Sequence, residues 1–244
     1  MSESGRHRQR PTMSDSLQLI EIRMLHGYFN ITVIEEWITF FATLLLLDRK
    51  TGRWQLFKLL MAAILIAETV GWYLRTHGHQ HENAIPFNVL ILITDLFLIW
   101  FFTTSSLLSK EKPVLFVLMA IFFAGFIVNL FFFQEPWVYN YYSETFADIL
   151  LSVICALFIY KVLRSDEYVN LLGLDYFWLA TGVLFSSLGS ALLYHFSNLL
   201  HQYSENTGID IGTYLNFSLN TLLYISLVIS FICSRKATRS LQVS

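Results

Sequence analysis

The stretch PVLFVLMAIFFAGFIVNLFFF, from Pro113 to Phe133, contains no charged side chain. A helix that crosses a membrane needs about twenty consecutive, predominantly apolar residues. Inside lipid, every backbone N–H and C=O group must find its partner within the protein, and a continuous apolar run without alternation favours a helix over a barrel strand. This stretch therefore predicts a transmembrane helix, and six other stretches of the chain follow the same pattern.

The composition supports a membrane protein throughout the chain. Of its 244 residues, 55% are hydrophobic, 16% are aromatic and only 14% are charged, whereas a soluble domain carries about 25% charged residues. The lipid bilayer is therefore the expected first partner. The net charge of -2 provides no basic field for nucleic acid. The two cysteines, Cys155 and Cys233, lie in apolar stretches and are too few for a disulfide framework or a zinc site.

Seven apolar stretches predict an all-α, polytopic membrane protein that folds as a seven-transmembrane-helix bundle. Residues 30–234 would form this bundle, residues 1–15 a disordered tail, residues 16–29 an amphipathic lead-in helix, and residues 235–244 a short basic cytoplasmic tail. The predicted spans run approximately over Ile31–Leu47, Leu56–Leu74, Phe87–Leu107, Pro113–Phe133, Thr145–Leu163, Leu174–Leu199 and Thr213–Cys233.

The distribution of Lys and Arg predicts the orientation, because cytoplasmic loops carry an excess of these residues. Placing the C-terminus inside puts most of them in the cytoplasm and leaves only Arg75 in the opposite loops. The basic N-terminal tail, with Arg6, Arg8 and Arg10, is the exception. The loops outweigh the tail, so the prediction is N-out and C-in, for a multi-pass protein of the cytoplasmic membrane.

Polar side chains inside the spans are expensive in lipid and are treated as functional hypotheses. Glu68 and Asp95 fall at roughly the same depth, about 10 Å from the outer end of adjacent antiparallel spans. His195 and Asn220 reach a similar layer, and Asn129 lies nearer the outer boundary. This one-sided distribution predicts a polar, ligand-binding cavity that opens outward and is closed by an apolar inner plug.

Two buried carboxylates at one depth do not both ionise without a nearby cation. Three arrangements of Glu68 and Asp95 remain open: one of them is protonated at neutral pH, the pair meets His195, or a ligand cation binds there. Glu35, Glu36 and Asp148 lie close enough to the predicted surface to be interpreted as solvated.

Two further patterns concern packing and metal binding. Gly182, Ser186 and Ser190 recur at intervals of four, a stripe of small residues that lets another helix approach closely. The stripe is interpreted as packing within the bundle or as the seam of a homo-oligomer. In the loop after the second span, the alternating residues His77, His79 and His81 could share one face of an extended segment and bind zinc or copper, although a solvated loop is the simpler interpretation.

Three stretches carry a resemblance to a known group: Glu68-Thr-Val-Gly71-Trp-Tyr73, Phe177–Phe185 (FWLATGVLF) and Asn216–Tyr224 (NFSLNTLLY). They resemble poorly characterised bacterial seven-helix membrane proteins and the membrane sensor regions of some histidine kinases. The resemblance implies sensing or signalling and brings no catalytic residues. The chain differs from the kinase type, because only a short basic tail follows Cys233.

The sequence thus favours a sensor over an enzyme. The expected module binds a small or apolar ligand in the outer half of the bundle and signals at the inner face to a partner, such as a signalling kinase or another membrane protein. No catalytic residue and no cofactor is expected: the stretch Thr213–Cys233 has neither the lysine of a retinal protein nor the zinc histidines of seven-helix membrane hydrolases. The alternatives are a membrane-embedded lipid-modifying enzyme and a small transporter.

Overall fold

The fold is all-α. A computed structural model describes residues 31–47, 49–164 and 170–240, and these residues contain helices and turns but no strand. The predicted tail of residues 1–15 and the predicted lead-in helix of residues 16–29 lie outside the described residues, as do the last four residues of the predicted basic tail.

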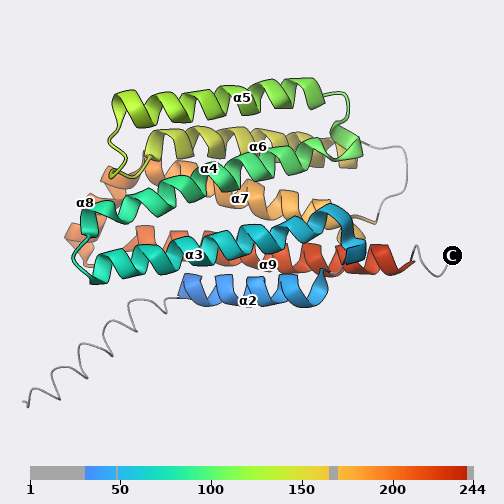
Figure 1. The fold of residues 1–244 in the computed structure, drawn as a ribbon, viewed down its shortest axis with the longest axis horizontal. Helices are drawn as coiled ribbons and strands as arrows, with labels where there is room; N and C mark the ends of the chain where they lie inside the picture. The colour runs from blue at the N-terminus through green and yellow to red at the C-terminus, as the bar shows by residue number, and fades with distance from the viewer. Residues whose placement is uncertain (1–30, 48, 165–169, 241–244) are drawn as a thin grey trace, which may run out of the picture.

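Long helices lie side by side along the longest axis of the molecule and alternate in direction (Figure 1). They are α2 (Ile31–Leu46), α3 (Leu56–Thr76), α4 (Ala84–Thr103), α5 (Lys112–Val128), α6 (Tyr141–Leu163), α7 (Asp175–His195) and α9 (Ile211–Ser240). Among the described residues, six helices are long and apolar enough to span a membrane, namely all of these except α2. The chain is therefore an all-α, multi-pass bundle of the membrane-protein type.

Short helical segments join the long ones. They are η1 (Arg49–Gln55), η2 (Gln80–Asn83), η3 (Ser106–Leu108), the π-helical η4 (Asn129–Phe133), η5 (Leu171–Gly173) and α8 (Ser197–Thr207). The sixth predicted span, Leu174–Leu199, is too long: α7 ends at His195, the backbone turns at Phe196, and α8 follows as a separate, largely exposed helix. At the other boundary, α9 continues through the first residues of the predicted basic tail, as far as Ser240.

The helix α7 lies at the centre of the packing, between α6 and α9. Gly182 permits the close approach of α9, because a Cβ atom at this position would lie 2.5 Å from the Cβ of Ser226. Gly189, about two turns further along α7, also permits a close approach, because a Cβ atom there would lie 2.5 Å from the side chain of Leu219. Ser186, between the two glycines, is buried. Within the predicted stripe, Gly182 therefore packs against α9 inside the bundle, whereas Ser190 is only half-buried.

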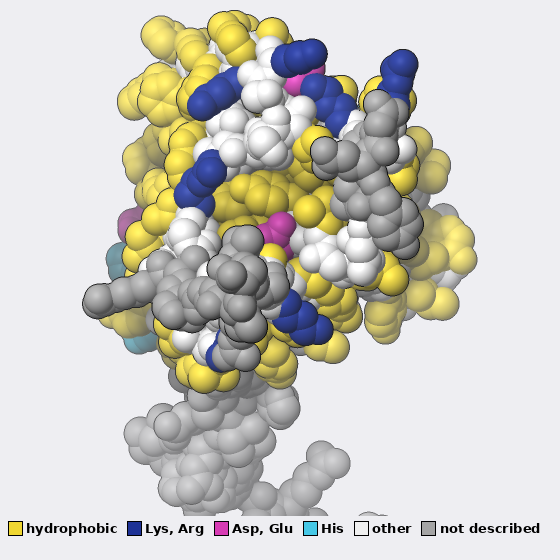
Figure 2. All heavy atoms as spheres, turned by 90° about the vertical axis from the view of Figure 1, so that its right-hand side faces the viewer, with side chains coloured by type: hydrophobic (Ala, Val, Ile, Leu, Met, Phe, Trp, Pro, Cys, Tyr) yellow, Lys and Arg dark blue, Asp and Glu magenta, His cyan; other side chains and the backbone are white. Residues whose placement is uncertain are grey.

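The end of the bundle that carries the C-terminus combines a basic rim with an aromatic interior. Figure 2 shows this end, with Lys and Arg side chains gathered around it. Just inside, the ring of Trp54 lies 4.9 Å from that of Phe101 and 5.3 Å from that of Tyr176, while Phe57 lies 5.4 Å from Phe231 (centroid distances). These five side chains, Trp54, Phe57, Phe101, Tyr176 and Phe231, are called the aromatic plug below.

Candidate functional site

A cavity of about 230 Å³ lies inside the bundle, between α2, α3, α4, α6, α7 and α9. Its apolar lining includes residues that lead down to the aromatic plug: Phe57, Leu60, Met61, Ile64, Leu98 and Leu227. Its polar lining consists of Glu36, Thr94, Asp95, Tyr139, Glu144, Asp148 and Tyr224. The cavity thus has carboxylates on its walls and an apolar floor.

One wall holds three carboxylates from α4 and α6, Asp95, Glu144 and Asp148. Glu144 and Asp148 stand four residues apart on α6, which places them on the same face of that helix. Asp95, 8% exposed, lies close enough to Glu144 and Asp148 for their charges to interact. Each carboxylate has one buried oxygen without a hydrogen-bond partner in the part of the chain that the structure describes: Oδ2 of Asp95, Oε2 of Glu144 and Oδ2 of Asp148.

Tyr139 closes this wall from the segment before α6. Its hydroxyl donates a hydrogen bond to Oε1 of Glu144 over 2.9 Å. Burial, followed by the nearby charge of Glu144, raises the pKa of Tyr139 well above its usual range, so the phenol keeps its proton and remains the donor. Tyr194 of α7 lies beside both Tyr139 and Glu144. The wall is therefore a small network of carboxylates and phenols.

The opposite wall holds Glu36 of α2, which is 3% exposed. The hydroxyl of Tyr224, on α9, donates to Oε1 of Glu36 over 3.1 Å, while Oε2 of Glu36 is buried without a hydrogen-bond partner among the described residues. Its sequence neighbour Glu35 does not line the cavity and accepts a hydrogen bond of 2.5 Å from Thr221, although its Oε2 is likewise buried without a described partner. Glu68 of α3 is half-buried and close enough to Glu36 for their charges to interact.

The structure divides the predicted layer of polar residues. Asp95 lines the cavity, but Glu68 lies outside its lining and is associated with Glu36 instead of Asp95. Asn220 is half-buried on α9 and does not line the cavity either. His195 requires correction: it is exposed at the last position of α7 and does not line the cavity.

Asn129 belongs to a different cluster, formed with Asn88, Asn140 and Ser143 and called the amide cluster below. The side-chain amide of Asn129 donates to Gln134, Asn140 and Ser143. Asn88, 3% exposed, donates to the carbonyls of Pro136 and Val138 over 3.1 and 2.9 Å and accepts from the backbone N–H of Asn140 over 2.9 Å. These bonds hold the segment between α5 and α6 against α4.

The structure describes the side chains of two of the three predicted metal-binding histidines, His77 and His79. His77 stacks on Tyr73 with 4.1 Å between ring centroids, and its Nδ1 lies 2.9 Å from the Tyr73 carbonyl oxygen. His79 contacts Glu82 at 3.4 Å, and the side chain of His81 lies outside the described part of the chain. Among the described residues, no group of three His, Cys, Asp or Glu side chains is placed to hold a metal ion.

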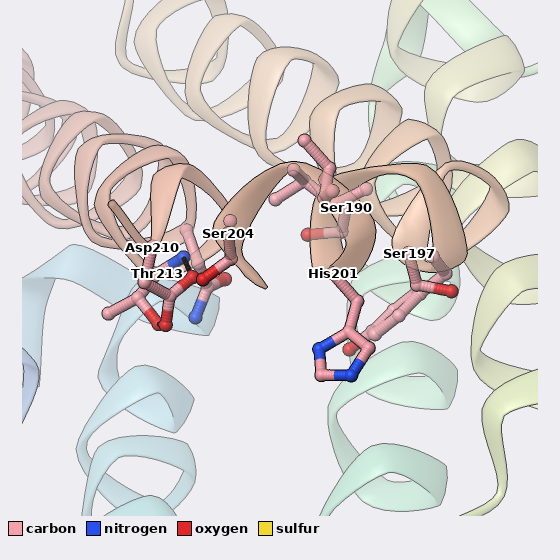
Figure 3. Close-up of a pocket in the computed structure, with 11 residues that line it drawn as sticks. Ser190, Ser197, His201, Ser204, Asp210 and Thr213 are labelled. Carbon is pink, nitrogen blue, oxygen red and sulfur yellow. Dashed lines mark hydrogen bonds between the residues drawn. The ribbon is translucent and has the colours of Figure 1, made fainter. Parts of the chain in front are cut away.

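A second, open pocket of about 370 Å³ lies on the surface where α7, α8 and α9 meet (Figure 3). Figure 3 shows Ser204 beside Asp210 and Thr213 on one side of the pocket, and Ser190, Ser197 and His201 on the other. Asp210 accepts from the side chain and the backbone N–H of Thr213, and these bonds lower its pKa. Tyr194 lines this pocket and also reaches Glu144 of the interior cavity, so it separates the two spaces.

The cavity contains several residues that the sequence did not single out. Glu36 and Asp148, interpreted as solvated, are both buried. Glu144 and Tyr139, which precede the predicted span Thr145–Leu163, also line the cavity. The spacing of Glu144 and Asp148, four residues apart in an otherwise apolar helix, was a signal for an inward-facing pair.

Comparison with known proteins gives no family assignment. No protein-family model, no curated protein and no solved structure matches this chain.

Proposed function

We propose that this protein is a receptor-like membrane sensor that binds a small ligand in the interior cavity. The observation that carries the proposal is the set of buried carboxylate oxygens on the cavity walls that have no hydrogen-bond partner among the described residues, at Glu36, Asp95, Glu144 and Asp148. An unsatisfied buried polar atom costs about 1–3 kcal/mol. A ligand that donates hydrogen bonds to these carboxylate oxygens would account for their burial.

In this proposal α2 is the seventh span, and the basic rim faces the cytoplasm. Its 16 described residues are strongly apolar, and they pack against α9 and α3 along the bundle. Basic residues gather at the end shown in Figure 2, in accordance with the positive-inside tendency of loops in the cytoplasmic membrane. The cavity walls with Glu36 and Glu144 then lie toward the outer side.

A route from the cavity to the inner face supports signalling. Phe57 lines the cavity floor and also packs in the aromatic plug, 5.4 Å from both Trp54 and Phe231. Phe231 lies on α9, which ends at the basic rim. A ligand that displaces Phe57 would therefore shift α9 relative to α3, and a partner such as a signalling kinase would detect that shift. The same plug closes the floor of the cavity, which a transporter would have to open.

The test is affinity purification of the tagged full chain in mild detergent, followed by mass spectrometry of bound proteins, lipids and small molecules. The wild type should retain a small molecule and a signalling partner. Leu223→Phe, which adds bulk to the cavity wall, should lose the small molecule, whereas Leu222→Phe on the exposed neighbouring position should keep it. A lipid that the purified protein converts on incubation would overturn the receptor proposal in favour of an enzyme.

A further inference from the structure

We infer that the cavity binds an organic ammonium ion with a compact apolar body. The inference rests on the proposed function, since it names the chemical class of the ligand for the same cavity. It is carried by the juxtaposition of unpartnered buried carboxylate oxygens with an apolar floor inside one cavity of about 230 Å³.

The charge of the lining is one-sided. The described residues that line the cavity include four carboxylates, Glu36, Asp95, Glu144 and Asp148, and no Lys, Arg or His. Like charges at one site repel, so a cation among them stabilises the ionised form of at least one. The Oδ2 atoms of Asp95 and Asp148 are buried and lack hydrogen-bond partners over residues 31–47, 49–164 and 170–240. An ammonium group offers up to three donors, which suits acceptors that come from two helices.

The arrangement suits an organic cation better than a metal ion. A bound Ca²⁺ collects about six to eight oxygens at about 2.3–2.6 Å, which requires ligands that converge on one point. Here Glu36 stands on α2 and the other carboxylates on α4 and α6, and no three of the described acidic side chains are placed to share a metal. The space between them is lined largely by apolar side chains, which give a metal ion nothing to bind.

The floor of the cavity determines where the rest of the ligand lies. On α4, Leu98 follows Asp95 by three residues, close to one helical turn toward the basic rim. On α3, Met61 and Phe57 line the same lower level. An ammonium group at Asp95 and Asp148 therefore places an attached hydrocarbon or aromatic group against these apolar side chains. The small volume favours a compact body over a lipid chain.

The test measures the thermal unfolding of the purified full chain with matched pairs of probes: 2-phenylethylamine against 2-phenylethanol, and hexylamine against hexanol. At neutral pH and constant salt, at least one amine should raise the unfolding temperature in a saturable way, while its alcohol should not. Asp95→Asn and Asp148→Asn should each weaken binding of that amine by about tenfold or more, because each removes a charged hydrogen-bond acceptor. Glu205→Gln, which alters an exposed carboxylate on α8 outside the cavity lining, should bind as the wild type does.

Two results would overturn the inference. One is that no amine stabilises the protein more than its alcohol does; the other is that sodium ions alone stabilise it as strongly as the amine. Both leave the proposed function intact if a small molecule co-purifies with the wild type and is lost from Leu223→Phe. A chain that retains no small molecule and no partner would instead reject the proposed function itself.

Discussion

Asn88 of the amide cluster and Asp95 of the cavity wall are polar side chains on the same helix, α4, yet they differ in their hydrogen bonding. Asn88 and Asp95 stand seven residues apart on α4, about two turns, and both are buried. Asn88 takes part in three hydrogen bonds with the segment before α6, whereas Oδ2 of Asp95 has no partner among the described residues. Asn88 therefore holds the fold together, and Asp95 is the residue to which the proposal assigns a ligand.

The largest effect is expected from breaking the amide cluster. Asn88→Ala removes two donors and one acceptor and leaves the carbonyls of Pro136 and Val138 and the N–H of Asn140 without their partner. We expect the free energy of unfolding to fall by about 3 kcal/mol or more, because buried groups that lose partners are costly. Denaturation in detergent measures this, with Asn198→Ala, on exposed α8, as the control. An equal loss in both variants would contradict a structural role for the cluster.

A smaller loss is expected at Tyr139, which connects the two regions. Tyr139→Phe removes the hydrogen bond of 2.9 Å to Glu144 and leaves a carboxylate oxygen without its donor. The free energy of unfolding should fall by about 1–2 kcal/mol. Tyr142→Phe, at a side chain that is 76% exposed, should change it by less than about 0.5 kcal/mol. A stability loss at Tyr139 no greater than at Tyr142 would mean that the hydroxyl does not hold this wall.

Asp95→Asn should act in the opposite direction. In the absence of ligand, it replaces a buried carboxylate that has an open oxygen and two like-charged neighbours. We expect the free energy of unfolding to rise by about 1 kcal/mol, as is common when a binding-site residue that costs stability is neutralised. Unfolding of ligand-free protein checks this. A clear loss of stability would place Asp95 with the structural groups and remove the contrast with Asn88.

The smallest change in stability is expected at Glu111, a carboxylate at the end of the bundle with the basic rim, which is paired with Lys161. Lys161 donates a hydrogen bond to Glu111, and this bond lowers the pKa of Glu111 below its usual 4.5. A lowered pKa in the folded state contributes stability above pH 4.5 that is lost as pH falls through the folded pKa. Glu111→Gln should therefore be slightly less stable than the wild type at pH 7, and the difference should vanish in acid. A gap that persists in acid would show that proton uptake by Glu111 is not responsible.

The apolar runs were sufficient to predict the helices, because hydropathy reports directly on contact with lipid. Asp95, singled out as a polar residue within an apolar stretch, is buried inside the bundle. The direction in which a side chain points was not readable, because it depends on which helices become neighbours; Glu36 and Asp148 therefore turned out to be buried instead of solvated. His195 was misplaced for another reason. Its estimated depth assumed that the span continued to Leu199, but the helix ends at His195.

The helix α9 is long enough for a small tilt to move its C-terminal end noticeably. Its 30 residues extend over about 45 Å, while the hydrocarbon core of a bilayer measures about 30 Å. Ser226, which packs closely against Gly182 of α7, lies near the middle of α9, so the helix can pivot about this contact. From there to Ser240 the helix measures about 21 Å, so a tilt of about 5° swings its tip sideways by about 2 Å. A small displacement of α9 beside the cavity would thus become a larger sideways displacement of the same helix at the basic rim.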